Sequence, residues 1–144
     1  MAPQPDNHEA DTRLTILFAC IHNSGRSVAA KVIAEHLAQG KAVILSGGSE
    51  PKSSINQNIA EALAKRGLST EKQYPKALTT EAVQESDVVV TMGCGETCPI
   101  FPGKKYLDWQ IEDPAGKDQA VAEKVVDEIW NKVSDLLKEL NING

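Results

Sequence analysis

The sequence predicts an α/β domain in which a four-stranded parallel sheet carries helices on both faces. Short apolar runs of strand length alternate with helical segments, and clusters of glycine and polar residues separate them. With 144 residues, the chain is long enough to bury one core and short for two. Ligands of such sheets bind beyond the carboxyl ends of the strands, so functional residues are expected there.

The first half of the chain supplies two strands and two helices. Residues 14–19 (LTILFA) form an almost continuous apolar run, as expected of a parallel strand that is covered on both faces. Residues 28–37 carry apolar side chains at helical spacing. Residues 42–45 (AVIL) predict a second strand that is closed by a serine and two glycines. Residues 55–66 then predict a second helix, which Gly67 ends.

The second half supplies the remaining elements. Residues 80–84 predict a short helix that is capped by Thr79 or the threonine after it. Residues 87–92 (DVVVTM) predict a third buried strand, and residues 106–109 a short fourth strand. Apolar residues then recur at helical spacing over residues 117–140, which predicts a long final helix.

Composition and charge narrow the classes of function. The chain is 41% hydrophobic and 24% charged, and its formal net charge is −5, so no basic surface for nucleic acid or membrane is expected. No apolar run approaches the roughly 20 residues that span a bilayer. Residues 1–13 are polar and acidic and lack the apolar centre of a secretory signal. We therefore expect a flexible tail over residues 1–13, a single domain over residues 14–144, and a cytoplasmic protein.

The most informative local pattern lies between the first strand and the first helix. Residues 20–27 (CIHNSGRS) have the pattern C-x5-R-S. A short loop that leads into a helix directs several backbone N–H groups to one point, and the helix dipole favours an oxyanion there. Arg26 can hold two oxygens of that anion, and the same field favours the nucleophilic thiolate of Cys20. The residues expected to bind the anion are Cys20, Ile21, His22, Asn23, Ser24, Gly25, Arg26 and Ser27.

Individual tasks follow from side-chain chemistry. Ser27 is expected to donate a hydrogen bond to the thiolate, Asn23 to brace the loop through its amide, and Gly25 to permit the backbone turn. Other interpretations stay open. Cys20 can be a buried small apolar residue at a strand end, and His22 can be an ordinary solvated histidine.

Two further cysteines, Cys94 and Cys98, follow the third strand on a loop with glycine and proline. Because Cys20 also follows a strand, Cys20 and Cys94 are expected at the same edge of the sheet. A zinc site would need two more ligands, and no second Cys/His pair has zinc spacing, so we expect no metal site. Packing cysteines would be poorly placed on a surface loop. The interpretation that best suits the chemistry is a redox pair.

The loop at residues 20–27 resembles the active-site loop of low-molecular-weight protein tyrosine phosphatases and of the arsenate reductases that share their fold. Its HNSGRS form resembles the reductase branch, and residues 91–109 (TMGCGETCPIFPGKKYLDW) resemble three-cysteine, thioredoxin-coupled arsenate reductases. The similarity extends over residues 14–140. It implies that Cys20 is the nucleophile and Arg26 the oxyanion clamp.

The resemblance also implies a disulfide relay. Arsenate would form an adduct with Cys20, and arsenite would leave as a Cys20–Cys94 disulfide forms. A Cys94–Cys98 disulfide would follow and be reduced by thioredoxin, or a mycothiol/mycoredoxin system would act instead. No bound cofactor is implied, and phosphate or sulfate would mimic arsenate. A potassium site of some relatives uses a glutamate where this chain has Lys31, so none is expected.

In the same families the aspartate of a late Asp-Pro is the general acid, which corresponds to Asp113 and Pro114. An aspartate before proline is also a common turn starter. Two other functions stay open besides arsenate reduction. A phosphatase would use Cys20, Arg26 and Asp113 but would not need Cys94 and Cys98. An oxyanion sensor would need no acid, so Asp113→Asn would leave it unchanged.

Overall fold

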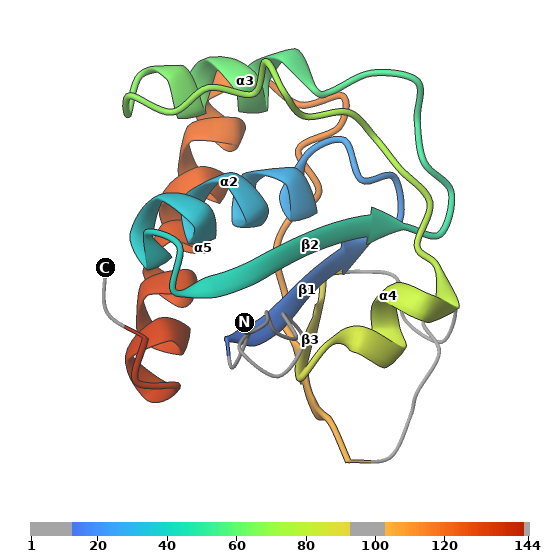
Figure 1. The fold of residues 1–144 in the computed structure, drawn as a ribbon. Coiled ribbons are helices and arrows are strands. Elements are labelled where there is room, and N and C mark those ends of the chain that lie inside the picture. The colour runs from blue at the N-terminus through green and yellow to red at the C-terminus, as the bar shows by residue number, and fades with distance from the viewer. Residues whose placement is uncertain (1–12, 93–102, 143–144) are drawn as a thin grey trace, which may run out of the picture.

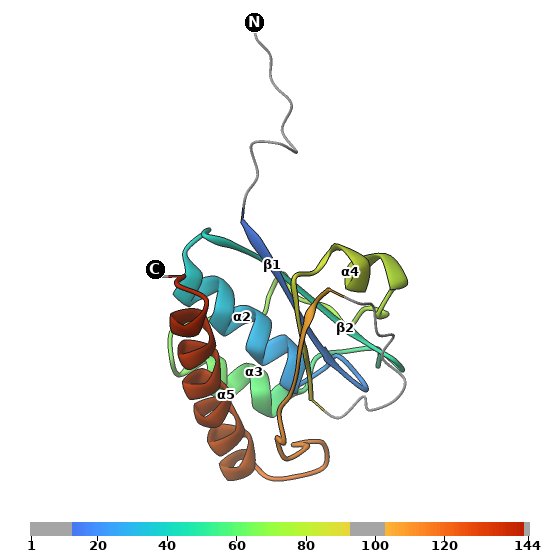
Figure 2. The same ribbon diagram turned by 90° about the horizontal axis from the view of Figure 1, so that it is seen from below.

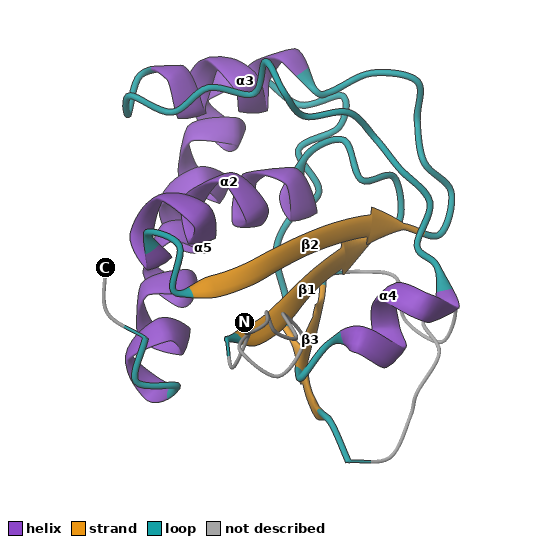
Figure 3. Cartoon of the chain, viewed as in Figure 1, coloured by secondary structure: helices purple, strands orange, loops and turns teal. Residues whose placement is uncertain are grey.

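The computed structural model describes residues 13–92 and 103–142. Its centre is a parallel sheet in the order β2-β1-β3-β4, with its strands drawn as arrows in Figures 1 and 3. The predicted fold class is confirmed, because four strands lie parallel and helices cover both faces of the sheet. The strands are β1 (Leu14–Cys20), β2 (Ala42–Gly48), β3 (Val88–Thr91) and β4 (Lys105–Asp108).

The helices divide unequally between the two faces. Helices α2 (Arg26–Ala38), α3 (Gln57–Ala64) and α5 (Gln119–Glu139) gather on one face, and the short α4 (Thr80–Glu85) lies on the other (Figure 2). The larger layer covers the main core, and α4 covers a small second cluster around Leu17. Both faces of the central strand β1 are therefore buried.

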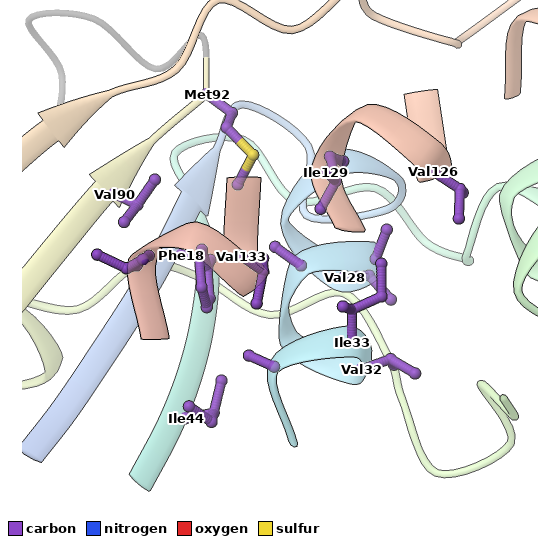
Figure 4. Close-up of a cluster of buried hydrophobic side chains, with 14 of the residues drawn as sticks. Phe18, Val28, Val32, Ile33, Ile44, Val90, Met92, Val126, Ile129 and Val133 are labelled. Atoms are coloured by element: carbon purple, nitrogen blue, oxygen red, sulfur yellow. The ribbon is translucent and has the colours of Figure 1, made fainter. Parts of the chain in front are cut away.

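The burial of β1 explains its continuous apolar run. Alternate side chains point to opposite faces of a strand, so Ile16 and Phe18 enter the main core, whereas Leu17 packs beside Val83 of α4. All three are fully buried. Figure 4 shows Phe18 in the main core together with side chains from α2, α5 and the neighbouring strands.

Helix ends differ from the predicted ones because capping side chains fix them. The predicted helix 55–66 begins at Gln57, since the side chain of Asn56 accepts a hydrogen bond from the amide of Ile59. The final helix begins at Gln119, two residues later than predicted, because Asp118 caps it. Strand β2 is longer than predicted, because Gly47 and Gly48 pair with the end of β1.

An ion-pair network joins α3 to α5. The Arg66 guanidinium lies 2.8 Å from Glu123 and 2.7 Å from Asp127. Burial opposes the charge of Arg66, but hydrogen bonds to the two carboxylates raise its pKa overall. The hydrogen bond from Arg66, supported by Gln119 and Lys65, lowers the pKa of Glu123 to about 2.

This network predicts an acid-dependent loss of stability. Because the folded-state pKa of Glu123 lies below its unfolded value, its stabilising contribution is present above about pH 4.5 and is lost as the pH falls to about 2. We expect the unfolding temperature of Glu123→Gln to fall less steeply than that of the wild type over this window, measured by circular dichroism. Glu128→Gln, on the same helix, is the control. Identical slopes for Glu123→Gln and the wild type would contradict the role given to the network.

Two sequence predictions concern segments at the limits of the described chain. The flexible tail falls on residues 1–13, of which only Arg13 is described. Within residues 13–92 and 103–142, no helix is long and apolar enough to cross a membrane.

Candidate active site

The candidate site lies where the central strands end. Strand β1 ends at Cys20 and its neighbour β3 ends at Thr91. The amide of Met92 donates a hydrogen bond of 2.7 Å to the carbonyl of Ala19, so the chain leaves β3 beside the start of the loop at residues 20–27. Cys94 and Cys98 follow in sequence and lie outside the described residues.

The carbonyl groups of the loop at residues 20–27 are hydrogen-bonded to a neighbouring segment. Four of them accept hydrogen bonds of 2.7–3.3 Å from backbone amides of residues 49–56, which follow β2. Among the described residues, the backbone amides of residues 22–25 have no hydrogen-bond acceptor. The loop therefore has free N–H groups next to the start of α2, as an oxyanion site requires. The four amide–carbonyl pairs are Ser49 with Cys20, Glu50 with Ile21, Lys52 with His22, and Asn56 with Ser24.

A chain of buried hydrogen bonds leads to the thiol. The amide of Lys76 donates to Asn23 Oδ1 at 2.9 Å, which directs Nδ2 of Asn23 to Ser27 Oγ at 2.6 Å. Since Ser27 Oγ accepts from Asn23, its own proton is free to point to Cys20 Sγ, 3.0 Å away. Cys20 is 2% exposed, and Asn23 and Ser27 are fully buried. The series of hydrogen bonds thus directs the hydroxyl proton of Ser27 towards the sulfur of Cys20.

The left-handed residue of the loop is Asn23, with φ of 48°, whereas the sequence suggested that Gly25 would make the turn. Asparagine tolerates this conformation better than most residues, and its side chain is tied at both ends. Gly25 instead has a negative φ. It lies where a β-carbon would be 3.4 Å from Pro114. This is an ordinary contact distance, so the Asp113–Pro114 segment packs directly beside the loop at Gly25.

The hydrogen bond from Ser27 predicts a change in reactivity. Removing the hydroxyl in Ser27→Ala removes the donor to Cys20, so alkylation of Cys20 by iodoacetamide at pH 7 is expected to slow about 3- to 10-fold. Peptide mass spectrometry separates Cys20 from the other cysteines. Ser46→Ala, another buried serine, is the control. Unchanged alkylation of Ser27→Ala would show that the hydroxyl does not stabilise the thiolate.

Gly48 makes the backbone of the loop possible. A β-carbon at this position would lie 2.7 Å from the carbonyl oxygen of Ile21 and 2.9 Å from the amide nitrogen of Asn23. Both contacts are with backbone atoms, which cannot swing aside as a flexible side chain can. The glycine therefore allows the end of β2 to support the loop directly.

Arg26 and Asp113 meet beside the loop. Arg26 is 7% exposed, and its guanidinium donates to the carbonyl of Ile111 at 3.2 Å. Its other terminal nitrogen lies 3.6 Å from Asp113 Oδ2. The Asp113 side chain is 47% exposed and accepts a hydrogen bond from the amide of Ala115. The fold thus brings the Asp113 carboxyl group from a distant part of the sequence next to Arg26, which belongs to the same loop as Cys20.

Comparison with known proteins identifies this arrangement. Residues 15–144 match the family model "Low molecular weight phosphotyrosine protein phosphatase". The chain belongs to this family. Arsenate reductase 1 of Bacillus cereus (strain ATCC 10987 / NRS 248) is 30% identical over 127 residues, which are 85% of this chain and 93% of the relative.

Solved structures agree with this family assignment. The thioredoxin-dependent arsenate reductase of Corynebacterium glutamicum has a TM-score of 0.80 and 34% identity over 93% of this chain, which spans 64% of the length of that protein. A structure described as an arsenate reductase in the phosphate binding state has a TM-score of 0.78 and 26% identity, and covers 88% of this chain and 98% of its own. The resemblance to arsenate reductases of the phosphatase superfamily is confirmed.

Two residues near the site, His22 and Glu112, contact residues outside the loop at residues 20–27. His22 Nδ1 lies 3.0 Å from the carbonyl oxygen of Glu50, so the ring faces the supporting segment at residues 49–56. Glu112, the neighbour of Asp113, pairs with Lys117 at 3.0 Å.

Lys31 of α2, whose side chain is only 15% exposed, pairs with Glu35 at 2.9 Å. Among the described residues, no group of three His, Cys, Asp or Glu side chains could hold a metal ion. Burial, with the nearby charge of Lys31, lowers the pKa of Lys76, whose ammonium lies 3.4 Å from Ser46 Oγ.

Sequence analysis missed the residues that support the loop from other segments. These are Gly48, residues 49–56 and the amide of Lys76. The pair Gly47-Gly48 is visible in the sequence, but its position after an apolar run indicates only the end of a strand.

Proposed function

We propose that this chain is an arsenate reductase with Cys20 as its nucleophile. The observation that carries the proposal is the buried Cys20 thiol, 3.0 Å from the Ser27 hydroxyl at the base of a loop with free amides. The same geometry suits phosphate ester hydrolysis, so the choice rests on the family branch. Relatives about 30% identical to this chain are named arsenate reductases, and Cys94 and Cys98 would have no task in hydrolysis.

Residues 20–27 would hold the arsenate oxyanion. Backbone amides of the loop and the Arg26 guanidinium, which donates through one nitrogen to the carbonyl of Ile111, would contact its oxygens. Phosphate and sulfate are tetrahedral anions of similar size and would compete for the same loop. A relative captured in a phosphate binding state supports this expectation.

The first chemical step joins sulfur to arsenic. The Cys20 thiolate attacks arsenic, one As–OH bond breaks, and the departing hydroxyl group takes a proton and leaves as water. Asp113, 3.6 Å from Arg26 at the edge of the site, would supply that proton. Arsenic is still As(V) in the Cys20 adduct, because no electrons have yet passed to it.

The second step would transfer two electrons. Cys94 as thiolate attacks Cys20 Sγ, the S–As bond breaks, and its electron pair stays on arsenic, which leaves as arsenite. The backbone contact of Met92 with Ala19 supports this step, because Cys94 is two residues further on, a reach of at most about 7 Å. Cys98 then attacks Cys94, which frees the Cys20 thiolate and forms the Cys94–Cys98 disulfide.

The last disulfide needs an external dithiol. Thioredoxin is the proposed donor, since the Corynebacterium glutamicum relative is named thioredoxin-dependent. A mycothiol/mycoredoxin system is the alternative. No bound cofactor is required. The three thiols must start reduced, so we propose a cytoplasmic location.

A tyrosine phosphatase is the second candidate function. Such enzymes need an aromatic wall for the substrate ring. Trp109, the aromatic residue nearest in sequence to Asp113, packs on Phe18 with ring centroids 5.9 Å apart and has the Lys132 ammonium 5.9 Å from its ring. Trp109 therefore packs on the core and on Lys132, which occupies the ring that a phosphatase would use for its substrate.

A burst experiment tests the proposal. Fully reduced, desalted protein is mixed with excess arsenate without added thiol, and arsenite released per chain is counted. About one equivalent, with Cys94 and Cys98 joined in a disulfide by mass spectrometry, is expected from the relay. If no arsenite is released, adding mycothiol or a phosphate ester distinguishes the small-thiol reductase from the phosphatase. Release without a Cys94–Cys98 disulfide would reject the relay alone.

A further inference from the structure

The turn that carries Asp113 is closed on itself. The amide of Ala115 donates to Asp113 Oδ1 at 3.0 Å, and the amide of Lys117 donates to the carbonyl of Pro114 at 3.0 Å. Gly116 has φ of 72°, which lets the chain reverse. These hydrogen bonds make residues 113–117 one rigid unit. A contact that fixes Lys117 therefore also orients Asp113.

The far end of this turn is held by the first turn of α3. Asn58 Nδ2 donates a hydrogen bond of 3.0 Å to the carbonyl of Lys117. Gln119, just past the turn, donates through Nε2 to the backbone carbonyl of Asn58 at 3.0 Å and to Glu123 at 2.8 Å. The segment at residues 113–119 and α3 are thus joined in both directions across about sixty residues of sequence.

The N-terminal end of α3 also contacts the loop at residues 20–27. The amide of Asn56 donates to the carbonyl of Ser24 at 2.7 Å. A β-carbon on Gly25 would lie 3.6 Å from Ile59 and 3.4 Å from Pro114, so loop, helix and acid turn meet at this glycine. The position of α3 therefore sets the loop and the acid turn relative to each other.

We propose that Asn58 is a positioning residue for the general acid. Its hydrogen bond to Lys117 sets the distance between the Asp113 carboxyl group and an oxyanion on the residue 20–27 loop. The inference rests on the proposed function, in which Asp113 protonates the departing oxygen. A proton donor works only within hydrogen-bond reach of its acceptor, so a small displacement of the turn slows that step while the anion still binds.

Asn58→Asp is the sharpest test variant. It keeps the size of the side chain and favours the N-terminus of α3, but it replaces the donor to the Lys117 carbonyl with an acceptor. Gln57→Glu is the matched control, because it adds the same charge one residue away at an exposed position. Asn58→Ala removes the donor without adding charge, and unfolding temperatures of all variants confirm that they fold.

A double-mutant cycle with Asp113→Asn decides the matter. Single-turnover arsenite release is expected to slow about 10-fold in Asn58→Asp and Asn58→Ala and to stay within about twofold of the wild type in Gln57→Glu. Phosphate affinity should be unchanged. In the Asp113→Asn background, the Asn58 substitutions should have no further effect, because the group that they position is already gone.

Two results would contradict the positioning role of Asn58. Equal slowing by the Asn58 substitutions in both backgrounds, or no slowing at all, would overturn the positioning role. A wild type that releases no arsenite either alone or with added mycothiol would reject the proposed function instead. The double-mutant cycle of Asn58 and Asp113 is then measured with phenyl phosphate as substrate. Its phenolate leaving group is poor and also needs a proton from Asp113, so the same criteria apply to Asn58.

Discussion

Cys20→Ser is expected to lower single-turnover arsenite release by at least about 10⁴-fold, while phosphate affinity stays within about threefold of the wild type. The serine hydroxyl is a far weaker nucleophile at neutral pH, and an alkoxide–arsenic bond offers no sulfur for a second thiol to attack. The loop amides and Arg26 are untouched by the substitution. The variant should therefore separate anion binding from chemistry.

The measurement combines arsenite release with a phosphate titration. Cys94→Ser is the informative companion variant, because it should form the Cys20–arsenic adduct, visible as a mass increase, yet release no arsenite. Residual activity of Cys20→Ser above about 1% of the wild type would show that another group attacks arsenic.

Gly48→Ala is expected to weaken phosphate binding and slow arsenite release by about 100-fold each. The added methyl group would lie 2.7 Å from the Ile21 carbonyl oxygen and 2.9 Å from the Asn23 nitrogen, so the loop backbone must shift. Overpacking of this kind costs roughly 1–3 kcal/mol of folding stability. A displacement approaching 1 Å at a reacting centre can cost about 10²-fold in rate.

Ser49→Ala is the control for Gly48→Ala. Its backbone amide still donates to the Cys20 carbonyl, and no atom is added against the loop. The two variants are compared by isothermal titration with phosphate and by unfolding temperature. Wild-type phosphate affinity in a folded Gly48→Ala protein would show that the loop adapts to a β-carbon at this position.

The sheet was predictable because burial leaves a direct mark on sequence. Strands β1 and β3 are covered on both faces, so they appear as the apolar runs LTILFA and VVV. Helix ends were less predictable. Whether Asn56 caps α3, or the helix starts one residue earlier, depends on which side chain reaches a free amide, and periodicity does not carry that information.

The site was predictable where its residues are contiguous. The segment from Cys20 to Ser27 is visible as a motif, whereas its supports lie elsewhere in sequence. Asn23 and Lys76 are 53 residues apart, and the bond uses the backbone amide of Lys76, so its side chain leaves no signal. The need for Gly48 arises only when β2 is placed against the loop, which is a property of the packed chain.

The burial of Cys20 also limits which molecules can return it to the reduced thiol. Only 2% of Cys20 is exposed, so its sulfur offers almost no surface that another folded protein could contact. A bond formed by the sulfur of Cys20 would have to pass to a more accessible thiol before a partner protein could reduce it. Under the proposed function, turnover would therefore need an intermediate carrier, which is either a second cysteine of the chain or a diffusible thiol.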